Sequence, residues 1–188
     1  MKKYSLSDVM KIYDLNFEEY GIVLIHPDTT DLKGYTSDVD DVFELLKRTR
    51  KNFYLLYPNF DDGYEYFYEK IKEFNIEELK HIQLVKNMRF EAFKCLLRYS
   101  KLNIGNSSSF VRESPDYGKH SLIVGKRQVG RVNKINVIYT QFQKKSLSEL
   151  VSNYWDSGDL KSETDNDIFE LKSLYESALE KIFKCSLH

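Results

Sequence analysis

The chain has 188 residues, of which 41% are hydrophobic and 30% are charged, and its formal net charge is −1. This length and composition suit one soluble globular domain. The net charge is too small to indicate binding to nucleic acid, and the sequence has no apolar run of the roughly 18 residues that a membrane span needs. The two cysteines, Cys95 and Cys185, are isolated, which fits a reduced, cytoplasmic protein better than a disulfide scaffold.

Short apolar runs alternate with amphipathic segments along the chain, after a short helix expected over 5–13. The runs are bounded by glycine, proline or polar residues, which indicates buried strands. The expected strands cover 21–25, 52–57, 81–85, 101–105, 120–125 and 135–140. The expected helices cover 36–50, 64–74, 89–100, 147–155 and 167–183. Ser162 and Asp165 have the spacing of a capping box for the last of these helices.

Strands that alternate with helices of ten or more residues favour parallel strands joined by right-handed crossovers. We therefore expect an α/β fold with a doubly wound, mostly parallel, Rossmann-like sheet. No linker or internal repeat divides the chain. The simplest organisation is a single domain over 1–188, in which 156–188 forms a C-terminal helical tail.

Polar loops follow four of the expected strands, and ligands of such sheets bind beyond the carboxyl ends of the strands. In chain order these loops read "HPDTTD", "PNFDDG", "NSSS" and "KRQVGR". The "NSSS" junction follows Gly105 and opens a helix, whose free N–H groups and adjacent hydroxyls suit a phosphate. The same residues are also those preferred for an ordinary helix cap, so both interpretations stay open.

The other loop residues each allow a functional and a structural interpretation. Glu113 could hold the vicinal hydroxyls of a ribose, or be a surface acid near a helix N-terminus. Arg127 and Arg131 could bind phosphate, or form a solvated basic loop. His26 could donate to a diphosphate or transfer a proton, or be structural. Asn59 and Asp61, with Asp62, could belong to a turn that caps the next helix.

The sequence contains no pattern for a bound cofactor or metal. Its four histidines and two cysteines lack metal-ligand spacing. It also lacks a P-loop, a Gly-x-Gly-x-x-Gly fingerprint and a Gly-x-Ser-x-Gly elbow. We expect no cofactor, and a dinucleotide oxidoreductase is disfavoured.

The stretch "GNSSSFVRESPDYGKHSLIVGKRQVGR" resembles the signature of the hydrolysing UDP-N-acetylglucosamine 2-epimerases. "LIHPDTTD" and "YPNFDDG" are similar to the family's His-Pro-Val-Thr and Tyr-Pro-Asn-x-Asp segments, and all occur in the family's order. The likeness covers about residues 5–155. It implies that the chain is the C-terminal, nucleotide-holding half of a two-domain GT-B-type fold. The activity that it implies belongs to amino sugar metabolism and converts UDP-N-acetylglucosamine to N-acetylmannosamine and UDP.

The resemblance also implies roles for particular residues. Ser107 and Ser108 would contact the diphosphate, Glu113 would hold the ribose, and Phe93 would lie near the uracil. Arg127 would bind phosphate. The remaining site residues would be the catalytic candidate His26 at the diphosphate and sugar, Asn59 and Asp61 lining the cleft, and Arg131 in the basic loop. Two departures from the family pattern are Phe110, which replaces a glycine beside the phosphate loop, and Asp28, which replaces a valine.

The chain matches only one of the two family domains, and acids that act on the sugar come largely from the other. We expect a UDP-sugar ligand and a missing N-terminal domain or partner chain, and a homo-oligomer stays open. The alternatives are a stand-alone UDP-sugar-binding module without turnover and half of a UDP-sugar glycosyltransferase. Because the last expected helix would cross to a partner domain, its apolar stripe and Trp155 would be partly uncovered, unless they pack on their own sheet.

Overall fold

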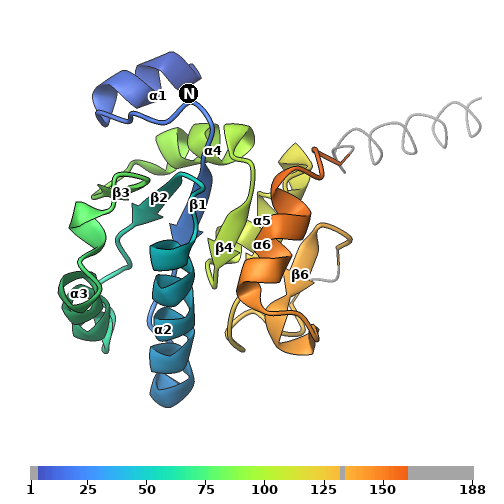
Figure 1. Cartoon of the computed structure of the whole chain (residues 1–188). Coiled ribbons are helices and arrows are strands. Elements are labelled where there is room, and N and C mark those ends of the chain that lie inside the picture. Colours follow the sequence, from blue (N-terminus) through green and yellow to red (C-terminus); the bar gives the residue numbers. More distant parts are fainter. Residues whose placement is uncertain (1–3, 132–133, 161–188) are drawn as a thin grey trace, which may run out of the picture.

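The computed structural model describes residues 4–131 and 134–160, which form a six-stranded, all-parallel sheet in the order β3-β2-β1-β4-β5-β6 (Figure 1). The strands are β1 Gly21–Leu24, β2 Phe53–Leu56, β3 Ile82–Val85, β4 Asn103–Gly105, β5 Ser121–Ile123 and β6 Val137–Tyr139. This order reverses direction between β1 and β4. The expected doubly wound α/β fold is confirmed.

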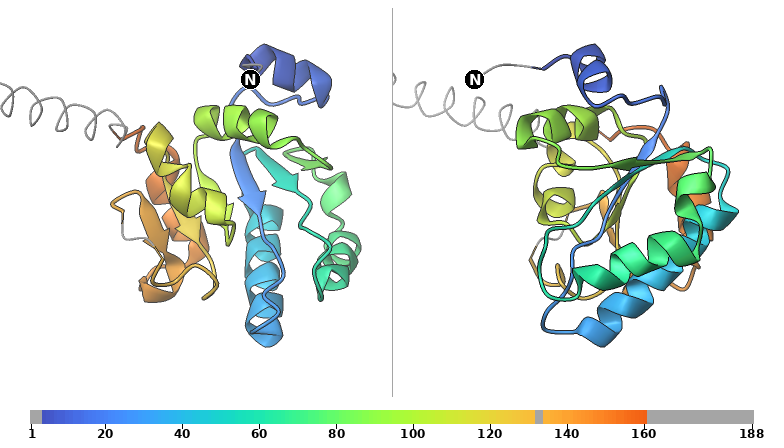
Figure 2. Two further views of the ribbon diagram at one scale, coloured as in Figure 1. Left: turned by 180° about the vertical axis from the view of Figure 1, so that it is seen from behind. Right: turned by 90° about the vertical axis from the view of Figure 1, so that its left-hand side faces the viewer.

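Helices cover both faces of the sheet (Figure 2). On one face lie α2 Leu32–Arg48, α3 Tyr64–Glu73 and α6 Leu147–Trp155. On the other lie α1 Leu6–Ile12, α4 Phe90–Tyr99 and α5 Ser108–Arg112. Short 3₁₀ turns complete the chain as η1 Ile76–Glu78, η2 Pro115–Tyr117 and η3 Thr140–Phe142. Among the described residues, no helix is long and apolar enough to cross a membrane.

The strands are buried on both faces, which is why they read as continuous apolar runs. In β1, Val23 packs with the cluster under α2, α3 and α6, whereas Ile22 and Leu24 pack with the cluster under α1, α4 and α5. Successive side chains of a strand point to opposite faces, so one strand contributes to both cores. The hydrophobic core therefore consists of two layers separated by the sheet.

The largest boundary difference is the start of α2, which begins at Leu32 instead of residue 36. The Asp31 side chain accepts a 2.9 Å hydrogen bond from the Gly34 N–H and caps the helix four residues earlier than expected. The prediction began the helix too late because Gly34, Thr29 and Thr30 are residues typical of a loop. The expected helical tail covers 156–188, of which residues 156–160 are described and are not helical. The rest of this tail, including the expected helix over 167–183 and its capping box, lies outside the described residues.

The carboxyl ends of β1 and β4 approach each other closely. Gly105 ends β4 with φ +144°, a conformation that favours glycine, and a Cβ at this position would collide with the Leu24 carbonyl. This close pairing brings the loops after β1 and β4 side by side at the point where the strand order reverses. Ligands of open α/β sheets bind at such a point.

Candidate functional site

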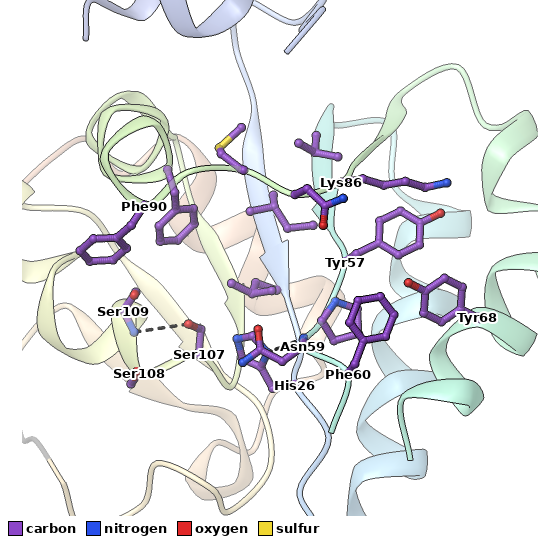
Figure 3. A pocket seen from close by; sticks show the side chains of 17 residues that line it. His26, Tyr57, Asn59, Phe60, Tyr68, Lys86, Phe90, Ser107, Ser108 and Ser109 are labelled. Carbon is purple, nitrogen blue, oxygen red and sulfur yellow. Dashed lines mark hydrogen bonds between the residues drawn. The ribbon is translucent and has the colours of Figure 1, made fainter. Parts of the chain in front are cut away.

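A cavity of about 660 Å³ opens at the carboxyl ends of β1 to β4 (Figure 3). Five of the predicted site residues line it, namely His26, Asn59, Phe93, Ser107 and Ser108. His26 follows β1, Asn59 follows β2, and the serines begin α5 after β4. Three of the four polar loops that are separate in the sequence thus meet around one cavity, at the edge where parallel strands place their carboxyl ends.

A second, more polar cavity of about 510 Å³ holds the remaining loop residues Asp61, Arg127 and Arg131. Asp28 and Lys126 line it as well. The predicted site is therefore divided between an apolar cavity and a charged one. His26 is affected by both, since it lines the first cavity while the charges of Arg127 and Asp61 in the second act on its imidazole.

His26 is held on its backbone and on its ring. Its N–H donates a 2.7 Å hydrogen bond to Asn106 Oδ1, and its carbonyl accepts a 2.8 Å bond from Asn106 Nδ2. Its ring Nδ1 accepts the backbone N–H of Asn59 at 3.3 Å. Burial lowers the pKa of His26 to about 4, with a further lowering by the Arg127 cation and an opposing effect of Asp61. The imidazole is therefore neutral near pH 7.

The serine loop forms a helix cap. The Ser107 hydroxyl accepts a 3.4 Å bond from the Ser109 N–H, and Phe110 N–H donates to the Ser107 carbonyl at 3.1 Å. This capping does not remove the serines from the cavity, because Ser107, Ser108 and Ser109 all line it. The structural interpretation of this junction is thus correct, and the functional one remains compatible with it.

Glu113 lines neither cavity and stands at the C-terminal end of α5, where its N–H donates to the Ser109 carbonyl. Its Oε2 is buried and has no hydrogen-bond partner within the part of the chain that the structure describes. A buried carboxylate oxygen without a donor is costly, so a hydrogen bond from a donor beyond the described residues would stabilise it.

The two departures from the family pattern differ in their effect. The Phe110 ring, expected beside the phosphate loop, is fully buried in the layer under α1, α4 and α5, with its centroid 6.5 Å from that of Phe93, and it lines neither cavity. Asp28 lines the charged cavity. Its carboxylate accepts bonds from the Thr30 hydroxyl at 2.6 Å and N–H at 3.1 Å, and the hydroxyl bond is the main cause of its lowered pKa.

Several lining residues were not predicted from the sequence. Phe60 and Phe90 are 73% and 51% exposed at the cavity, and Tyr57, Tyr68 and Lys86 line it as well. The sequence patterns had assigned Tyr57 to a strand end and Tyr68 and Phe90 to helices, and no local signal separates a lining ring from a core ring. Asn106 was also missed as a site residue, because its partners are distant in the sequence. The described residues contain no group of three or more His, Cys, Asp or Glu side chains that could hold a metal.

The strand order, the switch-point cavity and the polar strand-end loops define a Rossmann-like domain, with a cavity in the position where this class binds nucleotides. The family model for UDP-N-acetylglucosamine 2-epimerase matches residues 1–178, and the chain belongs to this family.

Similar proteins agree with this assignment. The chain is 32% identical over 147 residues to a UDP-N-acetylglucosamine 2-epimerase of Neisseria meningitidis. The aligned region covers 78% of this chain and 38% of the relative. It is 26% identical over 134 residues to a hydrolysing GDP/UDP-N,N'-diacetylbacillosamine 2-epimerase of Campylobacter jejuni, covering 70% of the chain and 35% of the relative. The chain thus spans little more than a third of these relatives.

The fold is similar to that of the UDP-GlcNAc 2-epimerase from Methanocaldococcus jannaschii, solved in complex with UDP-GlcNAc and UDP. The TM-score is 0.57 at 16% identity, over 80% of this chain and 42% of that one. The described residues therefore share the fold of less than half of that epimerase chain.

Proposed function

We propose that this chain is the UDP-binding half of a hydrolysing UDP-N-acetylglucosamine 2-epimerase, which converts UDP-N-acetylglucosamine and water to N-acetylmannosamine and UDP. The observation that carries the proposal is the cavity at the switch point, where His26, Ser107 and Ser108 meet an apolar wall containing Phe93. The aromatic wall suits a base and the hydroxyl-rich helix start suits a diphosphate. The sequence signature and the name of the Campylobacter relative support the hydrolysing part of the proposal.

Arg127 and Glu113 extend the proposed binding site beyond the cavity. The Arg127 guanidinium is half-buried, and its Nη1 donates a 3.4 Å bond to the Asn106 carbonyl beside the serine loop. A guanidinium at this place can pair with a phosphate oxygen. The buried Oε2 of Glu113 would accept a hydrogen bond from a ribose hydroxyl.

Turnover requires groups that this domain does not place in the cavity. No Asp or Glu side chain belongs to the described residues that line it, and His26 is neutral and accepts a hydrogen bond at Nδ1. Acid and base catalysis at the sugar needs a group that can take a proton near neutral pH. In the proposal, this group comes from an N-terminal domain or partner chain, and the chain alone binds UDP without turnover.

Calorimetry with UDP tests the binding part of the proposal. We expect saturable binding of one UDP per chain, weakened about tenfold in Arg127→Ala by loss of one charge-assisted contact. Lys33→Ala on α2, which lines neither cavity, is the control and should leave binding unchanged. Absence of UDP binding by the folded wild-type chain would contradict the proposal.

The enzymatic part is tested by release of N-acetylmannosamine from UDP-N-acetylglucosamine. We expect no product from the chain alone, and product when the N-terminal half of the Neisseria relative is added. A stand-alone binding module is the second candidate, favoured by the absence of a lining carboxylate among the described residues. UDP binding without product in either mixture would select this module over the enzyme half.

A further inference from the structure

Asn106 lies between three ligand-facing loops and is only 2% exposed. It follows β4 directly, and its own N–H donates to the Leu24 carbonyl at 3.2 Å as the last backbone bond between β1 and β4. In a continuing parallel ladder, the His26 N–H would next donate to the Asn106 carbonyl, and the His26 carbonyl would accept from the Ser108 N–H. Neither bond forms.

The side-chain amide of Asn106 takes both places. Its Oδ1 accepts the His26 N–H at 2.7 Å, and its Nδ2 donates to the His26 carbonyl at 2.8 Å. Each atom of the amide therefore satisfies one backbone group that the ladder leaves open. His26 is fixed as if it still belonged to the strand, although the chain of β4 has already turned into α5.

Because the side-chain amide makes these two bonds, the backbone carbonyl of Asn106 and the backbone N–H of Ser108 are not used in the β1–β4 ladder. The Asn106 carbonyl accepts Gln128 Nε2 at 2.8 Å and Arg127 Nη1 at 3.4 Å, so the loop after β5 is attached to it. The Ser108 N–H donates no hydrogen bond within residues 4–131 and 134–160 and stays at the cavity. Gln128 is fully buried, which makes this attachment a fixed part of the structure.

We propose that Asn106 is the positioning residue of the site, because its amide replaces one step of the β1–β4 ladder and so sets His26, the serine loop and the β5 loop around a single ligand. The proposal rests on the proposed function for the identity of that ligand, UDP. Figure 3 shows His26, Asn59 and Ser107 at the cavity, with the Ser107 hydroxyl bonded to the Ser109 N–H.

The variant Asn106→Asp tests this role with little change in shape. The carboxylate has no N–H for the His26 carbonyl and brings one oxygen against it. We expect UDP affinity to fall at least tenfold. The matched control is Asn136→Asp, in which an equally buried asparagine, whose Nδ2 donates to the Lys119 carbonyl at 3.0 Å, precedes β6 at the opposite end of the sheet. UDP affinity should stay within twofold there.

A second readout follows His26 itself and needs no ligand. Nitrogen-15 NMR of the imidazole, assigned by the signal lost in His26→Gln, should report a neutral ring with a proton-free Nδ1 in the wild-type chain. In Asn106→Asp the ring should titrate closer to its ordinary range, and in Asn136→Asp it should not change. Gln128→Met, which removes only the bond to the Asn106 carbonyl, replaces Asn106→Asp if the latter does not fold.

The outcomes separate this inference from the proposed function. The positioning role is wrong if the wild-type chain binds UDP and Asn106→Asp binds it with an affinity within twofold of wild type. It is also wrong if Asn106→Asp loses no more UDP affinity than Asn136→Asp does. In both cases the proposed function stands. If the wild-type chain does not bind UDP, the proposed function is wrong. The positioning role is then decided by the His26 signals, which support it if they change in the Asn106 variant alone and overturn it otherwise.

Discussion

The backbone N–H of Asn59, which follows β2, donates a hydrogen bond to the ring Nδ1 of His26, which follows β1, over 3.3 Å. Two adjacent strand-end loops are thereby joined through an imidazole nitrogen. A neutral imidazole that accepts at Nδ1 carries its proton on Nε2, and it can only donate from that atom. His26 is therefore suited to donate a hydrogen bond to a phosphate or sugar oxygen, and poorly suited to act as a base.

This geometry predicts how stability depends on pH. The pKa of His26 is lowered to about 4 from an ordinary 6.5, mainly by burial. Between these values the unfolded chain binds more protons at this residue than the folded one, so the contribution of His26 to the free energy of unfolding should fall as the pH drops from about 6.5 to 4. Asp38, whose pKa burial raises to about 6, contributes with the opposite sign. Urea denaturation at several pH values measures this.

His26→Gln should remove this contribution alone and leave those of Asp38 and of His120, whose pKa burial also lowers. The difference between wild type and His26→Gln isolates the contribution of His26. Profiles of equal slope for the two proteins would show that the ring is not held neutral by the fold.

The unpartnered Oε2 of Glu113 predicts a contact with the ribose of UDP. Removal of a hydrogen bond to a charged group costs about 1.5–3 kcal/mol, so Glu113→Ala should weaken UDP binding by at least tenfold. Calorimetry with UDP and 2'-deoxy-UDP, in wild type and variant, forms a double-mutant cycle. The preference of the wild type for UDP should vanish in Glu113→Ala, and a preference of unchanged size would contradict the ribose contact.

Phe110 is expected to act on stability and not on binding. Its ring is 0% exposed and packs under α4, so Phe110→Ala should cost about 3–5 kcal/mol of unfolding free energy, whereas Phe110→Leu should cost less than about 1.5 kcal/mol. UDP affinity of Phe110→Leu should stay within twofold of wild type. A large gain in affinity would mean that the ring obstructs the ligand. Phe60 is exposed and lines the cavity, so Phe60→Leu should lower UDP affinity and leave the free energy of unfolding nearly unchanged.

Ser114 is the centre of a buried polar network. Its hydroxyl donates to the Lys119 carbonyl at 3.0 Å and accepts from Asn103 Nδ2 at 3.0 Å and the Ser121 hydroxyl at 2.8 Å. Ser114→Ala leaves these groups short of a partner and should cost about 1–3 kcal/mol. Urea midpoints with unchanged slopes measure this, with the exposed Ser152→Ala as control. Equal midpoints for the two variants would contradict the network's role.

The sequence predicted the sheet because both signals it used are local. Continuous apolar runs mark strands buried on two faces, and the 3.6-residue period marks helices such as 147–155, which α6 matches. The grouping of His26, Asn59 and Ser107 was also predictable, since parallel strands place their carboxyl ends at one edge. The division of the loops between two cavities was not, and neither were the roles of Asn106 and Ser114. These depend on contacts between residues far apart in the chain, such as Asn106 with His26 and Ser114 with Asn103, which no local pattern encodes.

Trp155 is the single tryptophan of the chain. It is 2% exposed at the end of α6, with its ring 5.2 Å from that of Phe53 and its Nε1 3.3 Å from Glu19 Oε1. These neighbours mark the amino ends of β1 and β2, opposite the two cavities. The tryptophan fluorescence of the chain therefore reports whether α6 is packed against the sheet. A change in that emission on titration with UDP would report a rearrangement carried through the sheet and not contact with the nucleotide.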